Sequence, residues 1–171
     1  MVKKGIVSII LGMAMLYVFS VSVSAFSWAQ YYNNDSRFPM IWGHTRVATF
    51  IDRTSIAVQR YDPPYYIIAV KVFYAPDGGY GDMMGCHTER FYYNYDITKM
   101  YMDKKAGTND WIYLYPTYHD TVNSENKTVG EAAFYLAYHM KFYGAYRWKD
   151  IQFPDSNYED VFSDDFYRNL Q

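Results

Sequence analysis

A run of mostly apolar positions extends from Tyr65 to Tyr74, and eight of its ten residues are β-branched or aromatic. Side chains of these types fit the pleated surface of a sheet. Both alternating sets of the run are apolar except for Lys71, so the pattern predicts a central strand covered on most of both faces. At about 3.3 Å per residue, this strand would extend roughly 33 Å.

Shorter alternating segments on either side predict further antiparallel strands. Residues 52–55 contain aspartate and serine, whose side chains bond back to the local backbone, so we expect a turn there. Pro63 and Pro64 end the following strand because they cannot donate to a ladder, and a glycine-rich segment at 75–85 forms a loop. The sequence therefore predicts a meander of five or six strands, at residues 46–51, 56–61, 65–74, 86–94, 97–102 and 111–115, with residues 40–42 as a candidate start of the sheet.

The hydrophobic period becomes helical after Lys127. Thr128 and Glu131 form a capping box, and Gly144 is a natural stop, so we expect the main helix to run from Val129 to about Tyr143. A second box at residues 156–159 predicts a short C-terminal helix. The fold class is therefore α+β, with the main helix packed on the meander sheet and the short helix nearby. The face of the main helix that packs on the sheet carries Val129, Ala132, Ala133, Leu136, Met140 and Tyr143.

The opposite face of the main helix is also aromatic, whereas a surface helix is polar there. One interpretation is that the C-terminal helix or the N-terminal segment covers these rings. The other is that the rings contact a partner or a glycan. On the second interpretation, the contact residues are Phe134, Tyr135, Tyr138 and Phe142, together with Tyr80 in the glycine-rich segment.

The N-terminus has the three-part layout of a secretory signal. Lys3 and Lys4 precede an uncharged, mostly apolar segment at residues 5–23, and small residues at 23 and 25 predict cleavage after Ala25. The alternative is an uncleaved anchor, because the apolar segment is nearly long enough to span a bilayer. We therefore predict a signal peptide at 1–25, an irregular lead-in at 26–40 and one domain at 41–171, exported to the periplasm or the cell surface. The mature chain contains no second long apolar run, so we expect no membrane span in it.

Charge and composition exclude some classes of function. Loss of Lys3 and Lys4 leaves 14 basic residues against 18 acidic ones, a net charge of −4. Nucleic-acid binding is disfavoured because it depends on neutralising phosphates. The single cysteine, Cys86, excludes an intramolecular disulfide. The 21 tyrosines, 11 phenylalanines and 4 tryptophans indicate an aromatic core that extends onto a binding face.

Two groups of residues around Cys86 are candidates for chemistry. Cys86 and His87 follow two methionines, and such soft ligands suit copper or haem iron. Adjacent strand residues point to opposite faces, however, so the two would diverge. A nucleophilic Cys86 would need a base such as His44, His119 or His139, yet Cys86 opens a strand and not a helix.

Acidic side chains offer two further candidates. Asp77 and Asp82 flank the glycine-rich segment, but they lack the ligand spacing of a calcium loop. The C-terminal acids suit either a carboxylate pair of a glycosidase or the solvated face of a short helix. We expect no catalytic residue, metal or cofactor. The C-terminal acids are Asp155, Glu159, Asp160, Asp164 and Asp165.

The first part of the predicted sheet resembles the start of the domain in the surface-adhesin protein E family. The resemblance rests on Trp42, on the segment from Phe50 to Ile56 and on the long strand that follows. The order of elements is similar over roughly residues 42–143. Members of that family are small bacterial envelope proteins with a secretory signal and an antiparallel sheet packed by a helix. The resemblance implies adhesion to host matrix proteins rather than catalysis, and it assigns no binding residue in this chain.

The sequence therefore predicts an exported, non-enzymatic envelope or surface domain that binds a host matrix or envelope macromolecule through exposed aromatics. One alternative is a secreted cell-wall or glycan hydrolase that uses Cys86 or a carboxylate pair. Another is a purely structural envelope protein. The pattern of residues determines neither the ligand nor the oligomeric state.

Overall fold

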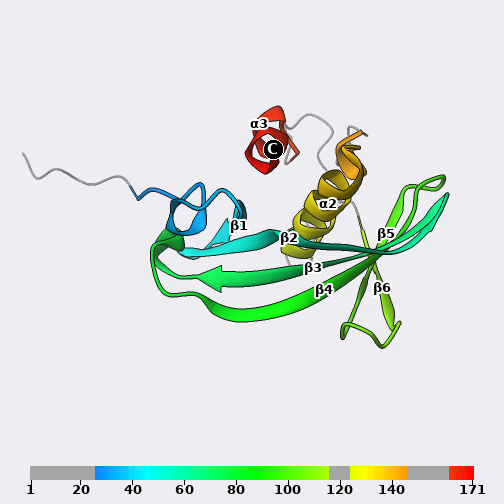
Figure 1. Cartoon of the computed structure of the whole chain (residues 1–171), viewed down its shortest axis with the longest axis horizontal. Coiled ribbons are helices and arrows are strands. Elements are labelled where there is room, and N and C mark those ends of the chain that lie inside the picture. Colours follow the sequence, from blue (N-terminus) through cyan, green and yellow to red (C-terminus); the bar gives the residue numbers. More distant parts are fainter. Residues whose placement is uncertain (1–25, 116–123, 146–161) are drawn as a thin grey trace, which may run out of the picture.

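The computed structural model describes residues 26–115, 124–145 and 162–171 (Figure 1). Six strands form one sheet in the order β1-β2-β3-β4-β5-β6, and each pairs antiparallel with its neighbour. This sheet and its two α-helices confirm the predicted α+β meander. The elements are η1 (Tyr32–Asn34), β1 (Met40–His44), β2 (Val47–Asp62), β3 (Tyr65–Ala75), η2 (Asp77–Gly79), β4 (Met84–Asn94), β5 (Lys99–Asp103), β6 (Trp111–Leu114), α2 (Ser124–Tyr138), η3 (Tyr143–Ala145) and α3 (Asp164–Leu170).

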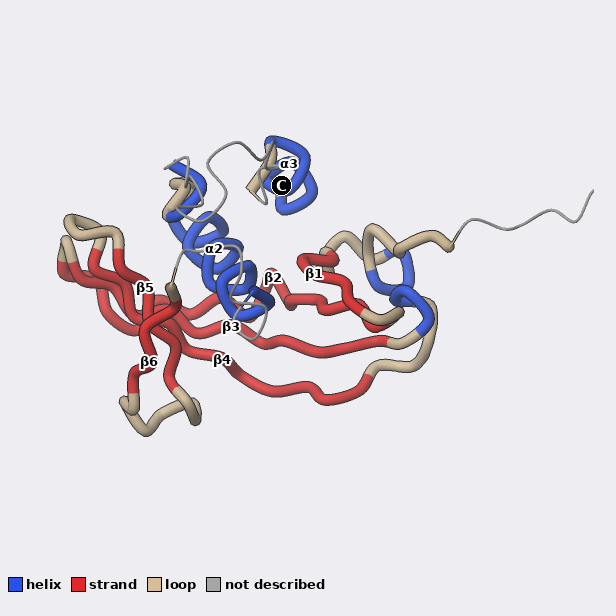
Figure 2. The backbone as a smooth tube through the Cα atoms, turned by 180° about the vertical axis from the view of Figure 1, so that it is seen from behind, coloured by secondary structure: helices blue, strands red, loops and turns tan. Residues whose placement is uncertain are grey.

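Both α-helices lie on one side of the sheet (Figures 1 and 2). The sheet curls, so that β6 crosses the direction of β3 and β4 (Figure 2). Helix α2 lies in this curl, with contacts to β1, β2, β3 and β5, and α3 packs beside it. None of the helices in the described ranges is long and apolar enough to cross a membrane.

Strand β2 is continuous, so the predicted turn at residues 52–55 is wrong. The register with β3 shifts between Asp52 and Ala57, which forms a bulge. Asp52 Oδ1 accepts hydrogen bonds from the amide of Thr54 at 3.0 Å and from its hydroxyl at 2.6 Å. The Ser55 hydroxyl donates to the carbonyl of Asp52 and accepts from the amide of Lys71 at 2.8 Å. These side chains bond to the local backbone as expected, but they stabilise a bulge that keeps β2 on β3.

Strand β3 is the central strand that its sequence predicts. It pairs along its length with β2 and β4. Val70 and Val72 are fully buried beneath α2, and Phe73 is buried on the opposite face. Both faces are therefore covered toward the end of the strand, as the two apolar alternating sets predict.

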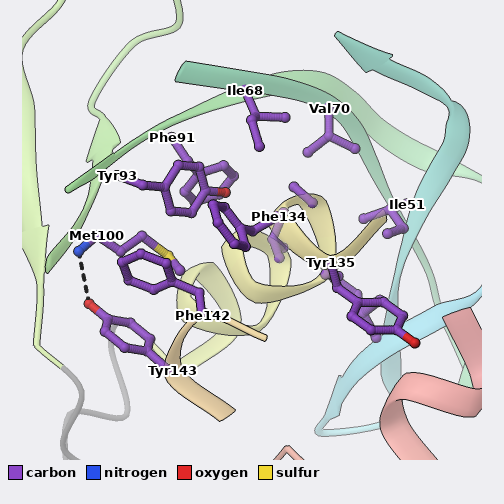
Figure 3. Packing of buried hydrophobic residues seen from close by; sticks show 14 of the residues in the cluster. Ile51, Ile68, Val70, Phe91, Tyr93, Met100, Phe134, Tyr135, Phe142 and Tyr143 are labelled. Carbon is purple, nitrogen blue, oxygen red and sulfur yellow. Dashed lines mark hydrogen bonds between the residues drawn. The ribbon is translucent and has the colours of Figure 1, made fainter. Parts of the chain in front are cut away.

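The main core fills the space between α2 and the sheet (Figure 3). Gly130 allows the helix to approach closely, because a Cβ there would lie 3.0 Å from the ring of Phe91 and closer still to the sulfur of Met100. The hydroxyl of Tyr93 donates to the carbonyl of Gly130 at 2.8 Å. Below the helix, the Tyr143 hydroxyl accepts from the amide of Met100 at 3.1 Å.

A smaller core lies on the other face of the sheet, at the end near β1. The rings of Phe50 and Phe73 stack there with centroids 5.4 Å apart, and Tyr32 contacts both rings edge-on. The predicted lead-in at 26–40 supplies Ala29, Tyr32 and Phe38 to this core. The lead-in is therefore packed onto the sheet as part of the fold.

Helix α2 begins earlier than predicted and ends earlier, so the capping box at Thr128 and Glu131 is wrong. Residue 128 already lies inside the helix, and its hydroxyl donates to the carbonyl of Ser124 at 2.9 Å. The predicted second box at 156–159 lies outside the described residues. The described residues near the C-terminus form the short helix α3, whose N-cap Ser163 accepts a hydrogen bond from the amide of Phe166.

Glu131 is fully buried, and it holds together the segments that follow α2. Its carboxylate accepts from the amides of Phe142 at 2.8 Å, Tyr143 at 2.6 Å and Gly144 at 3.3 Å. The hydroxyl of Tyr167 in α3 donates to the same carboxylate at 2.7 Å. Burial raises the pKa of Glu131, although these four donors favour the charged form.

We expect Glu131→Ala to lower the free energy of unfolding by about 3 kcal/mol, because the substitution removes the acceptor that three amides and one hydroxyl share. Tyr167→Phe removes one donor only and should cost about 1 kcal/mol. Urea denaturation at neutral pH measures both values. A smaller loss in Glu131→Ala than in Tyr167→Phe would contradict the central role of this carboxylate.

Candidate functional site

Three of the five predicted contact residues are buried, so the prediction that they face a partner is wrong. Phe134 and Phe142 are fully buried and Tyr135 is 8% exposed. The curled sheet packs against one side of α2, where the ring centroids of Phe134 and Tyr93 lie 4.9 Å apart (Figure 3). Tyr135 packs against Tyr167 of α3 at 4.8 Å. The sheet covers one part of the second aromatic face, and the C-terminal helix covers the other.

The remaining two predicted contact residues are accessible. Tyr138 is half-buried beside Tyr61 and Tyr66, whose rings lie 5.8 and 5.1 Å from its own. Tyr80 follows η2 and is 66% exposed. These two side chains lie on different elements, so the structure brings together no single surface from the predicted set.

A larger group of accessible aromatic rings lies on the face of the sheet opposite α2. Strand alternation produces it: Phe91, Tyr93, Met100 and Leu114 are buried beneath the helix, so their neighbours point the other way. Tyr92 is directly opposite Tyr101, which is opposite Tyr113. We call this group the tyrosine face; it consists of Tyr65, Tyr92, Tyr101, Trp111, Tyr113 and Tyr115.

The rings of the tyrosine face are in continuous contact across four strands. The ring of Tyr92 lies 6.3 Å from Tyr65, 5.6 Å from Tyr101 and 5.7 Å from Trp111. Tyr101 lies 5.3 Å from Tyr113, which lies 4.5 Å from Tyr115. Tyr65 is 37% exposed and Tyr115 58%, and the rings between them are partly exposed. The result is a wide, shallow aromatic surface.

Cationic side chains pack against the edges of the tyrosine face. Arg60 lies over Tyr65 at 5.5 Å, Arg90 over Trp111 at 5.2 Å and Lys99 over Tyr113 at 5.4 Å. Arg60 also pairs with Asp62 and Arg90 with Asp103, which offsets most of the positive charge. The cations therefore orient the rings more than they create a basic patch.

Asp103 fixes the loop between β5 and β6 beside the tyrosine face. Its buried carboxylate accepts from Arg90 at 2.5 Å and from the hydroxyl of Thr108 at 2.8 Å. The amides of Gly107, Asn109 and Asp110 donate to it as well. Burial alone would raise the pKa of Asp103, but these donors lower that pKa to about 2. The loop is thus held by one ionised side chain.

A polar cluster lies at the N-terminal end of α2. His87 Nε2 lies 3.1 Å from Glu89 Oε1, and the hydroxyl of Thr49 donates to Glu125 at 2.9 Å. Hydrogen bonding to Glu89 raises the pKa of His87 to about 9. Burial, reinforced by the charge of Glu125, raises the pKa of Tyr74 to about 12, and burial raises the pKa of Glu125. Sequence reasoning missed this cluster, because its members are scattered over three strands and one helix.

The other candidate catalytic and metal-binding residues form no site in the described part of the chain. Cys86 is exposed on β4, and the adjacent His87 side chain belongs to the polar cluster. Within the described ranges, no three His, Cys, Asp or Glu side chains form a group that could hold a metal. His119, Asp155, Glu159 and Asp160 lie outside those ranges.

Comparisons of the chain with models of known protein families, with curated proteins and with solved structures give no match. The resemblance to the surface-adhesin protein E family therefore stays a prediction.

We expect Asp103→Asn to destabilise the fold by roughly 2 kcal/mol at pH 7, since one unit of pKa shift corresponds to about 1.36 kcal/mol. A lowered carboxyl pKa stabilises the fold above the ordinary pKa of 3.8, and the contribution is lost as the pH falls toward 2. The difference between wild type and Asp103→Asn in urea denaturation should therefore shrink between pH 4 and pH 2. Asp110→Asn in the same loop is the control, because its exposed ion pair with Lys104 contributes little. An equal effect of both substitutions would contradict the role of Asp103.

The His87–Glu89 pair predicts the opposite pH dependence. A raised histidine pKa stabilises the fold fully below its ordinary value of 6.5, and this contribution is lost as the pH rises toward 9. Wild type should therefore lose more thermal stability between pH 6 and pH 9 than His87→Gln, measured as the melting temperature. His44→Gln, an exposed histidine on β1, should behave as wild type does. Full retention of the pH dependence in His87→Gln would rule out this pair as its source.

Proposed function

We propose that the chain is an exported, non-enzymatic envelope or surface domain that binds a macromolecular partner through the tyrosine face. The observation that carries the proposal is the continuous contact of six rings on one open face of the sheet. The export part of the proposal rests on the secretory layout of residues 1–25.

The chemistry of the face suits a large partner. Tyrosine and tryptophan are enriched at interfaces, because each joins a large apolar surface to a polar tip and loses little conformational freedom on binding. Neighbouring rings restrict one another here, so the surface is formed before the partner arrives. A wide, shallow arrangement favours a macromolecule over a small substrate, which would require a cleft.

The charge of the face also narrows the class of partner. Arg60 and Arg90 are paired with carboxylates. Lys99 lies over Tyr113 of the tyrosine face and forms no ion pair with the described residues. Nucleic acid is a poor fit, since its binding requires many phosphate contacts. We therefore favour a host matrix glycoprotein or an envelope glycan as the partner, in line with the adhesion that the family resemblance implies.

A second candidate function is a secreted cell-wall or glycan hydrolase. It is favoured by the polar cluster, where the half-buried Glu125 with its raised pKa lies near Glu89 and His87. Two carboxyl groups in different environments are the requirement for acid–base cleavage of glycosides. In this hypothesis the pair is Glu89 and Glu125, in place of Cys86 or the C-terminal acids.

The test is binding of the purified protein to immobilised matrix glycoproteins and to cell-wall glycan fragments. Tyr101→Ala removes a ring at the centre of the tyrosine face. It should weaken saturable binding about tenfold, a change of about 1.4 kcal/mol in the free energy of binding. Tyr80→Ala is the matched control, because it removes an exposed tyrosine from the segment between η2 and β4, outside the sheet.

Each outcome distinguishes the hypotheses. Weakening by Tyr101→Ala alone supports the tyrosine face. Weakening by Tyr80→Ala alone would transfer the site to the glycine-rich segment and contradict the proposal. Progressive shortening of the glycan fragments, abolished by Glu89→Gln or Glu125→Gln, would favour the hydrolase. Absence of binding to either class would leave a structural envelope role.

A further inference from the structure

A groove of about 440 Å³ runs along the edge strand β1, away from the tyrosine face. Its walls come from the N-terminal segment before β1, from β1 itself and from α3, which lies on the α2 side of the sheet (Figure 1). The volume lies within the range of about 300–1,000 Å³ that small-ligand sites occupy. The side chains used below are Trp28, Trp42, Phe166, Gln30, Asp165 and Asn169.

The aromatic wall of the groove is held in place by backbone contacts. Gly43 has no side chain, and a Cβ there would lie only 2.8 Å from the ring of Trp28, so the indole rests directly on β1. The amide of Ala29 donates to the carbonyl of Gly78 at 2.8 Å, and the amide of Met40 donates to the carbonyl of Gln30 at 3.0 Å. Trp28 nevertheless remains 39% exposed. A large, fixed and accessible aromatic surface is therefore present at the groove.

Polar groups lie on the same groove. Gln30 Nε2 donates to Asn169 Oδ1 at 3.0 Å, which links the N-terminal segment to α3. This bond uses the carbonyl oxygen of Asn169, so its amide nitrogen remains available as a donor. The carboxylate of Asp165, paired with Arg168 on the surface, adds acceptors at the rim.

We propose that this groove binds a neutral pyranose sugar, independently of the tyrosine face. The apolar C–H face of a sugar ring packs on an indole, while its hydroxyl groups both donate and accept hydrogen bonds. Trp28, Trp42 and Phe166 supply the aromatic surfaces; Gln30, Asn169 and Asp165 supply the polar partners. Among the described residues, those that line the groove include a carboxylate and no lysine or arginine, so an anionic ligand is disfavoured.

The test titrates the full protein with glucose, galactose and N-acetylglucosamine, and with N-acetylneuraminic acid as the anionic comparison. Saturation-transfer NMR and tryptophan fluorescence report binding. We expect saturable binding of at least one neutral sugar below about 20 mM and weaker binding of the anionic sugar. Trp28→Ala should reduce the affinity about tenfold, and Asn169→Ala about threefold.

Two further variants keep the test decisive. Gly43→Ala leaves the indole in the chain but displaces it from β1, so it should also lower the affinity if Trp28→Ala folds poorly. Tyr61→Ala removes an exposed ring elsewhere and should bind as wild type does.

The proposal is overturned if no neutral sugar binds, or if N-acetylneuraminic acid binds more tightly. It is also overturned if Tyr101→Ala abolishes sugar binding while Trp28→Ala does not, since the sugar would then lie on the tyrosine face. Failure of the groove leaves the proposed macromolecular binding untouched, because that proposal is tested by Tyr101→Ala on different probes.

Discussion

The alternation of side chains along β4, β5 and β6 determines both faces of this molecule. Once Phe91, Tyr93 and Met100 are buried beneath α2, every intervening residue must point away from the helix. A shift of one residue would place Tyr92 and Tyr101 in the core and expose the rings that now contact Phe134. The core and the tyrosine face are therefore two consequences of one register.

The fold class, the central strand and most strand positions follow from local pattern. The alternation of apolar and polar residues along a strand indicates whether one face or both faces are buried. The bulge in β2 does not, since Asp52 and Ser55 offer the same hydrogen bonds to a tight turn and to a bulge. The choice is made by pairing with Lys71 on β3, which is a long-range contact. The role of Glu131 depends on long-range contacts in the same way, because its partners lie beyond the end of the helix and not at its start.

The candidate site was harder to predict than the fold. The sequence shows aromatic residues on both faces of α2 and at both parities between residues 91 and 95, and it does not say which set is covered. The curl of the sheet decides the question by enclosing Phe134 and Phe142. The groove beside β1 depends on Trp28 and Asn169, which lie far apart in sequence, and no local signal connects them.

Two buried carboxylates act as tethers in a chain whose single cysteine excludes an internal disulfide. Asp103 gathers the amides of one loop, and Glu131 gathers those that follow α2 together with a hydroxyl of α3. Each ties a chain segment to the sheet or the helix through several donors at once.

The two ends of the sheet differ in the size of the core that stabilises them. The end near β1 has the smaller core, which consists of Ala29, Tyr32, Ala48, Phe50, Phe73 and Ala75. Elements with few buried apolar contacts open at lower free energy than the global fold. Amide protons of the N-terminal segment should consequently exchange with solvent ahead of those in α2 and β3, and each such opening would dismantle the Trp28 wall while the rest of the domain stays folded.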